Sequence, residues 1–446
     1  TTALQMALQP PQTGFALQAD GKMVSASEGV NSNEIKVTRH NPDGTIDTSF
    51  GTNGLVVTSF ATDRPIPHTI VVQDDGKILV GGRFSQSTIT PLLVRYNNDG
   101  TLDSSYGVGG VADLSSVTSL RIEDMELTPD GKILAAMGIN GSAQLRAMRV
   151  TDAGVLDTTF GTGGIRSFSG ISYVASAIKT LPDGRFLLMG EGSTDGVIVR
   201  SLANGALDTT FGTAGQQTID FGTGGNFTRY HTIKVDSSDR IVVAAFVSAI
   251  STPNSVDFAV ARLNANGTFD ATFDSDGKVV TDVLTGRDDL STSATIQDDD
   301  KIVVVGYSDP AAGSNQISVV RYNVDGSLDS TFSGDGKFDF TASSFAAQRS
   351  FGSELQPDGR LLILSGWGND FQIARMEMGA VHLFGSDTID ITDDDVLQDF
   401  GDAPDAAQTG FASSYPVTKT ENGARHVDAG PRLGADRDLE SDGVHT

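Results

Sequence analysis

The chain repeats a hairpin signature seven times, and this repetition limits the folds open to it more than any other feature. In each copy a short apolar run meets a tight turn, most often Asp-Gly, and a second apolar run follows. Because Gly takes the positive φ that such turns demand, Asp-Gly between apolar runs predicts a β-hairpin. The first turn residues recur at intervals of 53 to 61 residues, at Asp20, Asp75, Asp130, Asp183, Ser238, Asp299 and Asp358.

A second signature follows each hairpin and combines an Arg, an Asp eight residues later and an aromatic residue three positions further on. Such a pair beside a core aromatic favours a salt bridge that ties a strand to the following loop; a sevenfold ligand ring is the alternative. In the seventh unit no Asp follows Arg375 at this distance, and His382 stands near the place where the Asp would be. We expect direct salt bridges in six units, between Arg39 and Asp47, Arg95 and Asp103, Arg149 and Asp157, Arg200 and Asp208, Arg262 and Asp270, and Arg321 and Asp329.

The residues between the signatures form short β-branched runs that end at Gly, a pattern that predicts β-strands. A unit of this length holds four strands with their turns, the content of one propeller blade. We therefore expect an all-β, seven-bladed β-propeller of tandem four-stranded repeats over residues 1 to 386, with an open β-solenoid as the structural alternative. Residues 1 to 14 match no repeat, which leaves open how the first and last strands close the ring.

The charge and composition restrict the partners of the chain. The 57 acidic residues outnumber the 31 Lys and Arg residues and give a net charge of -26, which repels nucleic acid and anionic membrane surfaces and favours calcium. The longest apolar run, residues 241–250, is about half of the roughly 20 residues that a membrane helix requires, so we expect no membrane insertion. The chain has no Cys, which excludes disulfides and thiolate sites and fits an exported bacterial protein. The first residues do not form a signal peptide, so we expect a secreted form to have lost it already.

The two signatures together resemble a known repeat family. Their consensus sequences, near Leu-Gln-Pro-Asp-Gly-Lys and Asn-x-Asp-Gly-x-Leu-Asp-Thr-Thr-Phe-Gly, are similar to the delta-60 repeats of bacterial surface and secreted proteins. The resemblance covers roughly residues 1 to 385. It implies a propeller on an exported, often very large protein, located outside the cell or at its surface, and no defined activity.

The composition changes near Asp387, where the repeats stop. Residues 387 to 446 hold 14 Asp or Glu residues against 4 Lys or Arg residues. The segment around 401–405 and the later motifs at 422–426 and 438–443 resemble the GEVED-type modules of large bacterial adhesins. This pattern breaks off at Thr446, so we expect residues 387 to 446 to be an acidic linker and a partial β module within a longer polypeptide.

The end of the chain alternates acidic residues before Gly443. Carboxylates at alternate positions followed by Gly are typical of calcium loops of the Asp-x-Asp-x-Asp-Gly kind. The spacing predicts calcium as a cofactor, and the resemblance adds two carboxylates of the 401–405 turn to complete the shell; a solvated acidic tail is the alternative. The expected ligands are Asp436, Asp438, Glu440 and Asp442, together with Asp402 and Asp405.

These features favour an extracellular binding, adhesion or spacer module that calcium stabilises, and not an enzyme. Its ligand is a glycan or a surface protein. The first alternative is a polysaccharide hydrolase or lyase with its site at the propeller channel, where loops of several blades converge. The second alternative is a structural component of a surface layer or fibre. The six His residues show no metal-ligand spacing, and no catalytic residue is predicted.

Overall fold

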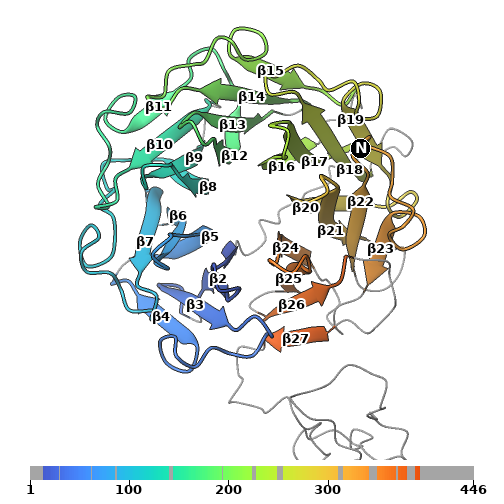
Figure 1. Ribbon diagram of the computed structural model, residues 1–446. Coiled ribbons are helices and arrows are strands. Elements are labelled where there is room, and N and C mark those ends of the chain that lie inside the picture. The colour runs from blue at the N-terminus through green and yellow to red at the C-terminus, as the bar shows by residue number, and fades with distance from the viewer. Residues whose placement is uncertain are drawn as a thin grey trace, which may run out of the picture. The chain divides into compact units, whose positions relative to one another are not determined.

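The computed structural model describes residues 14 to 391, except 30, 62, 86–87, 140–143, 193, 223–227, 249–254, 310–314, 341–348, 368–369 and 379–386. The regular elements of these residues are all β-strands, arranged as seven antiparallel sheets around a central axis (Figure 1). The fold is the seven-bladed β-propeller that the repeats predict. None of the described residues belongs to a helix with the length and apolar character that crossing a membrane requires.

Each blade is built from one contiguous segment of the chain, so that the sequence repeat and the structural repeat coincide. The first three blades comprise β1 (Gly14–Leu17), β2 (Met23–Glu28), β3 (Glu34–His40) and β4 (Leu55–Ser59); β5 (Pro65–Val72), β6 (Ile78–Phe84) and β7 (Thr90–Tyr96); and β8 (Leu120–Leu127), β9 (Ile133–Ile139), β10 (Arg146–Val150) and β11 (Ile165–Ser167). The fourth and fifth comprise β12 (Val174–Thr180), β13 (Phe186–Glu191), β14 (Gly196–Ser201) and β15 (Gln216–Ile219); and β16 (Thr228–Val235), β17 (Ile241–Ser248), β18 (Val256–Leu263) and β19 (Lys278–Thr281). The sixth and seventh comprise β20 (Asp289–Ile296), β21 (Ile302–Ser308), β22 (Gln316–Tyr322) and β23 (Lys337–Phe340); and β24 (Arg349–Leu355), β25 (Leu361–Trp367), β26 (Asp370–Met376) and β27 (Asp387–Ile391).

Two blades depart from the simple pattern. The second blade has three strands, and a single bridge between Val94 and Val111 stands at the place of the fourth. In the seventh blade the fourth strand is β27, which pairs with β26. The acidic segment that begins at Asp387 therefore starts with a strand of the last blade, because the outer edge of β26 needs a hydrogen-bonding partner.

The ring closes between two complete blades. The first and last blades lie side by side (Figure 1), and their inner strands β1 and β24 contact each other. Met23 of the first blade packs with Leu362, Leu364 and Ile373 of the seventh in one buried cluster. Within the described ranges no strand is exchanged between these two blades, so closure there depends on packing and on contacts between their loops.

The hydrophobic core lies between neighbouring blades. Strand β17 shows how the sequence produces it, because successive side chains of a strand point to opposite faces. Ile241 and Val243 pack toward the fourth blade, whereas Val242 and Ala244 pack toward the sixth. Both faces of a middle strand are thus buried, which explains why these strands are continuous apolar runs without alternation.

The Arg and Asp residues of the second signature form the expected ion pairs in all six units. The Nε to Oδ2 distances are between 2.7 and 2.9 Å, and the Arg side chains are at most 10% exposed. The second carboxylate oxygen of each Asp accepts a hydrogen bond from the Ser or Thr hydroxyl two residues later, at 2.5 to 2.7 Å. Each guanidinium also lies over the aromatic ring of the signature, 4.4 to 4.9 Å from its centroid. The pairs are therefore part of the interior of the fold.

The same arginines join each blade to the next one. The Nη1 atom of each Arg donates a hydrogen bond to a backbone carbonyl in a turn of the following blade, as in Arg262 to Val324 at 2.5 Å. The seventh unit takes part as well, because Arg375 donates to the Pro42 carbonyl of the first blade at 3.1 Å. The acceptors of the other five are Asn98, Asp152, Ala203, Ala265 and Met378. A closed circle of arginine contacts thus runs around the ring.

A basic residue of the hairpin signature also contacts the Asp that pairs with the repeat arginine. The basic residue that follows the turn reaches the buried Asp of its own blade, as in Lys22 to Asp47 at 3.2 Å and Arg185 to Asp208 at 3.2 Å. Burial alone would raise the pKa of Asp208, but hydrogen bonds from Thr210 and the Arg200 guanidinium lower it to about 2. The two sequence signatures therefore meet at one carboxylate.

Replacing one buried arginine is expected to destabilise the whole ring. In Arg262→Met the Asp270 carboxylate stays buried without its main partner, and such a loss costs about 3–5 kcal/mol. The free energy of unfolding, measured by denaturant titration, should fall by that amount. The control is Arg360→Met, whose side chain is 40% exposed and pairs with Glu377 at 3.0 Å; surface pairs contribute at most about 1 kcal/mol. Equal losses in the two variants would contradict a structural role of the repeat arginines.

Candidate functional site

The residues predicted from the sequence divide into two groups. The six Arg and Asp pairs lie inside the blades, where protein groups occupy them, so the described structure does not arrange them as a ligand ring. The calcium ligands predicted in the tail, Asp402, Asp405, Asp436, Asp438, Glu440 and Asp442, lie outside the described residues.

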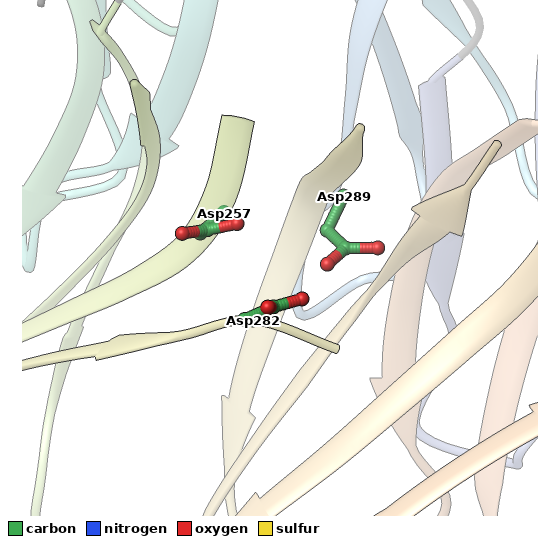
Figure 2. A group of neighbouring side chains, drawn as sticks. All are labelled: Asp257, Asp282 and Asp289. Carbon is green, nitrogen blue, oxygen red and sulfur yellow. The ribbon is translucent and has the colours of Figure 1, made fainter. Parts of the chain in front are cut away.

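Three aspartates gather between the fifth and sixth blades, at a place that the sequence analysis did not predict. Asp257 belongs to β18, Asp282 directly follows β19, and Asp289 is the first residue of β20. Figure 2 shows that the three side chains are neighbours although they come from separate elements. One carboxylate oxygen from each lies within 4.8 Å of the other two. We call this group the Asp triad.

Two members of the Asp triad are fully buried, and the third, Asp282, is half-buried. Asp289 is 0% exposed and Asp257 is 3% exposed. The Oδ2 atom of Asp289 accepts hydrogen bonds from the Val283 and Leu284 backbone amides at 2.7 and 3.1 Å. Its Oδ1 atom, like that of Asp282, is buried and makes no hydrogen bond of normal geometry among the described residues. The Ser308 side chain lies close enough to Asp289 to lower its pKa in part. Buried carboxylate oxygens without a partner are costly, so the arrangement calls for a cation or a proton.

The electrostatics of the Asp triad agree with this. Burial, together with repulsion from Asp257, raises the pKa of Asp289 to about 7. Burial and the charge of Asp282 likewise raise the pKa of Asp257 to about 6. The charge of Lys337 counteracts this rise in the pKa of Asp257 in part. Its Nζ atom donates to the backbone carbonyl of Asp282 at 2.5 Å, and the described residues show no ion pair between Lys337 and the triad. The three carboxylates repel one another, and this repulsion is a free-energy cost that a bound cation removes.

The spacing of the Asp triad suits a single hard cation. Oxygen ligands lie about 2.3–2.6 Å from calcium, so two ligands of one ion are at most about 5 Å apart. The triad oxygens meet this condition, and carboxylates are the ligands that calcium prefers. The sequence offered a weak signal, because Asp257 interrupts the apolar pattern of a middle strand between Val256 and Phe258.

The central channel is the second candidate site. A cavity of about 600 Å³ is lined by the inner strands of all seven blades. Six of these strands, β5, β8, β12, β16, β20 and β24, contain a β-bulge at the same place. Such bulges redirect a side chain and recur beside functional sites. In the first five of these strands the bulged residues line the channel; they are His68, Glu123, Ser176, His231 and Thr292.

The channel carboxylates nearest the hairpin turns hold neighbouring blades together. Asp124 of β8 accepts a hydrogen bond from the Ile178 backbone amide of β12 at 2.9 Å. Glu126 accepts hydrogen bonds from the amide and hydroxyl of Thr180 and pairs with Lys179 at 2.7 Å. Burial raises the pKa of Asp124 to about 6. These two carboxylates are already engaged by protein groups, which leaves little of them for a substrate.

The comparisons with known proteins agree with the repeat and the fold. Five segments match the family described as "Domain of unknown function (DUF5122) beta-propeller", at residues 18–50, 73–106, 181–211, 237–273 and 297–332. Each segment begins near the hairpin turn and ends at the aromatic residue beneath the repeat arginine. The chain is thus a β-propeller repeat protein. No curated protein matched its sequence.

Solved structures with a similar fold share little sequence with the chain. A streptogramin B lyase is 13% identical, with 80% of this chain and 92% of that chain covered and a TM-score of 0.46. A catalytically inactive virginiamycin B lyase from Staphylococcus aureus with quinupristin is 14% identical, with 83% and 97% covered and a TM-score of 0.46. A calcium-binding protein, regucalcin, from Agrobacterium tumefaciens is 13% identical, with 66% and 82% covered and a TM-score of 0.35. These values say nothing about the activity of the chain.

The raised pKa values of Asp257 and Asp289 predict a pH-dependent penalty when divalent cations are removed. The pKa of Asp289 is higher in the folded state than in the unfolded state, so the native protein binds the extra proton, and the stability that this provides is lost as the pH rises from about 4 to about 7. Asn at position 289 carries no charge at any pH. In EDTA, the melting temperature of Asp289→Asn relative to the parent should therefore increase across this range and stay constant above it.

The control for this measurement is the exposed residue Asp325, whose pKa is lowered by hydrogen bonds from Ser327. In EDTA, the difference in melting temperature between Asp325→Asn and the parent should not grow between pH 4 and 7. If the melting temperature of Asp289→Asn relative to the parent were also constant between pH 4 and 7, Asp289 would stay ionised at low cost in the native protein.

Proposed function

We propose that this chain is a calcium-stabilised binding and spacer module of a bacterial protein that acts outside the cell or at its surface. The observation that carries the proposal is the Asp triad, in which three carboxylates converge across the interface of two blades. An ion held there joins Asp257 and Asp282 of the fifth blade to Asp289 of the sixth, and so stiffens the ring. The acidic tail supplies the second calcium site, as its alternating carboxylates predict.

Calcium fits the Asp triad better than magnesium does. Magnesium demands nearly ideal octahedral geometry and retains several waters, whereas calcium accepts irregular shells of six to eight oxygens. A site with three carboxylates is expected to be weak, in the range of about 10⁻⁴–10⁻³ M that is typical of extracellular modules. The absence of Cys also suits a protein that functions outside the cell.

The channel supports a role in binding over a role in catalysis. A polysaccharide hydrolase needs two carboxylates that face its substrate. Asp124 and Glu126 instead bind the backbone of the neighbouring strand, and the Asp triad lies between two blades rather than among the residues that line the channel. A rigid platform with polar groups at its axis is suited to hold a ligand, for which a glycan is our leading candidate.

Calcium should stabilise the protein through the Asp triad. A ligand present at about 100 times its Kd adds about 2.7 kcal/mol to the stability of the folded state. The melting temperature should therefore rise with calcium for the parent protein, and the rise should be absent in the Asp257→Asn, Asp289→Asn double variant. Magnesium at the same concentration should give a smaller rise.

A second double variant separates the triad from the tail. Asp438→Ala, Asp442→Ala should retain the calcium-dependent rise in melting temperature but lose part of the heat in a calorimetric titration with calcium. If the triad variant and the parent respond equally to calcium, the triad does not hold the ion. If the tail variant and the parent give equal heats of calcium binding, Asp438 and Asp442 do not bind calcium.

A further inference from the structure

Four arginines lie at the ends of strands that are opposite the Asp-Gly hairpins. Arg64 directly precedes β5 and Arg83 lies on β6, both in the second blade, whereas Arg121 lies on β8 of the third blade and Arg229 on β16 of the fifth. None of the four is among the residues that line the channel cavity. Three glutamates lie among them, and each is paired with one arginine. The pairs are Arg64 with Glu28 at 2.8 Å, Arg121 with Glu123 at 2.5 Å, and Arg229 with Glu191 at 3.6 Å. We call this group, with Arg83, the arginine rim.

Arg83 is the member of the rim that forms no ion pair or hydrogen bond of its side chain with the described residues, although the charges of Glu123 and Glu28 act on it. It is half-buried on β6 and faces Arg121 and Glu123 of the third blade, whose charges act on it. Its Nε atom is buried and has no hydrogen bond among the described residues. Burial, with a contribution from Arg121, lowers the pKa of Arg83. A guanidinium in such a position is costly unless an anion binds it.

His68 lies beside this arginine, and its closest polar contact is a long one to Glu123. Its side chain is 2% exposed, and neither ring nitrogen has a hydrogen bond among the described residues. The closest approach to Glu123 is 3.5 Å, from Nδ1 to Oε2. Burial lowers the pKa of His68, so the imidazole is neutral near pH 7 and offers one donor and one acceptor. Two such atoms suit a hydroxyl group.

Glu123 is held firmly in the rim. Its carboxylate lies against Gly138 so closely that a Cβ atom at position 138 would be 2.0 Å from Oε1. Burial would raise the pKa of Glu123, but the neighbouring His68 and Arg121 lower it, so the group is ionised. The rim therefore has four positive and three negative charges, an excess of one positive charge in a chain of net charge -26. This excess matches a monoanion, and the fixed glutamates oppose a more highly charged ligand.

We propose that Arg83 and His68 form a binding site for a ligand that carries one carboxylate next to hydroxyl groups, the chemistry of a uronic acid. The planar guanidinium binds the carboxylate through two parallel hydrogen bonds, and the imidazole binds an adjacent hydroxyl. Further hydroxyl groups meet Ser176, whose Oγ atom is buried in the channel without a partner among the described residues. The inference rests on the proposed binding role and names its ligand class.

Calorimetric titration of the whole chain with D-glucuronate, D-glucose and acetate tests the site. Glucuronate should bind, with both glucose and acetate at least tenfold weaker, because each lacks one of the two recognised groups. Arg83→Met should weaken glucuronate binding at least tenfold. Glu123→Gln should strengthen it, because it removes a nearby negative charge and the ion pair that occupies Arg121. Since the two variants change affinity in opposite directions, misfolding cannot imitate the result.

The control is Arg360→Met, which removes a positive charge from the outside of the seventh blade and should leave glucuronate affinity unchanged. Equal binding of glucose and glucuronate, or unchanged affinity in Arg83→Met, would overturn the proposal. No binding of glucuronate by the parent would also overturn it. The calcium-dependent melting temperature of the same samples distinguishes this failure from that of the proposed function, because the Asp triad shares no residue with the rim.

Discussion

One guanidinium group per blade organises this propeller. In all seven blades it donates a hydrogen bond to the backbone of the next blade, and in the first six it also pairs with an Asp of its own blade and lies over an aromatic ring. The planar fork of Arg makes these contacts at fixed angles, which a Lys ammonium cannot do. The contact therefore sets the angle between neighbours as well as the fold of each blade, and seven repetitions of one angle close a ring.

The repeat made the architecture predictable from the sequence. The spacing of Arg and Asp gave the ion pairs because both residues sit at the ends of one local segment, whose geometry depends little on distant parts of the chain. The contacts from Arg to the next blade were not predicted, because the acceptors are backbone carbonyls of residues as different as Val324, Ala203 and Pro42. Every residue type has a backbone carbonyl, so the sequence does not indicate which residue accepts such a hydrogen bond.

The candidate sites were harder to predict for the same physical reason. Asp257 and Asp289 are 32 positions apart and meet only because two blades pack against each other. His68 and Glu123 are the extra residues of two bulges, and a bulge changes the direction of a side chain without a distinctive residue type. Neither site repeats as a whole. The fourth blade has Asp195 and Asp220 at the positions of Asp257 and Asp282, but Thr228 stands at the position of Asp289. His231 shares the bulge position of His68, but Thr292 takes the position of Glu123 in the blade that follows.

The way in which the ring closes has a mechanical consequence. Many closed sheets lock their ends by sharing strands between the two termini, but here the first and last blades are each complete. The seam is held by a small apolar cluster around Met23 and by the contacts of Arg375 and Gln356 with Pro42. Tension between residues 14 and 391 would act across this seam without first unravelling a blade. A spacer under load would open there as a hinge, and each blade could remain folded while the ring lengthens.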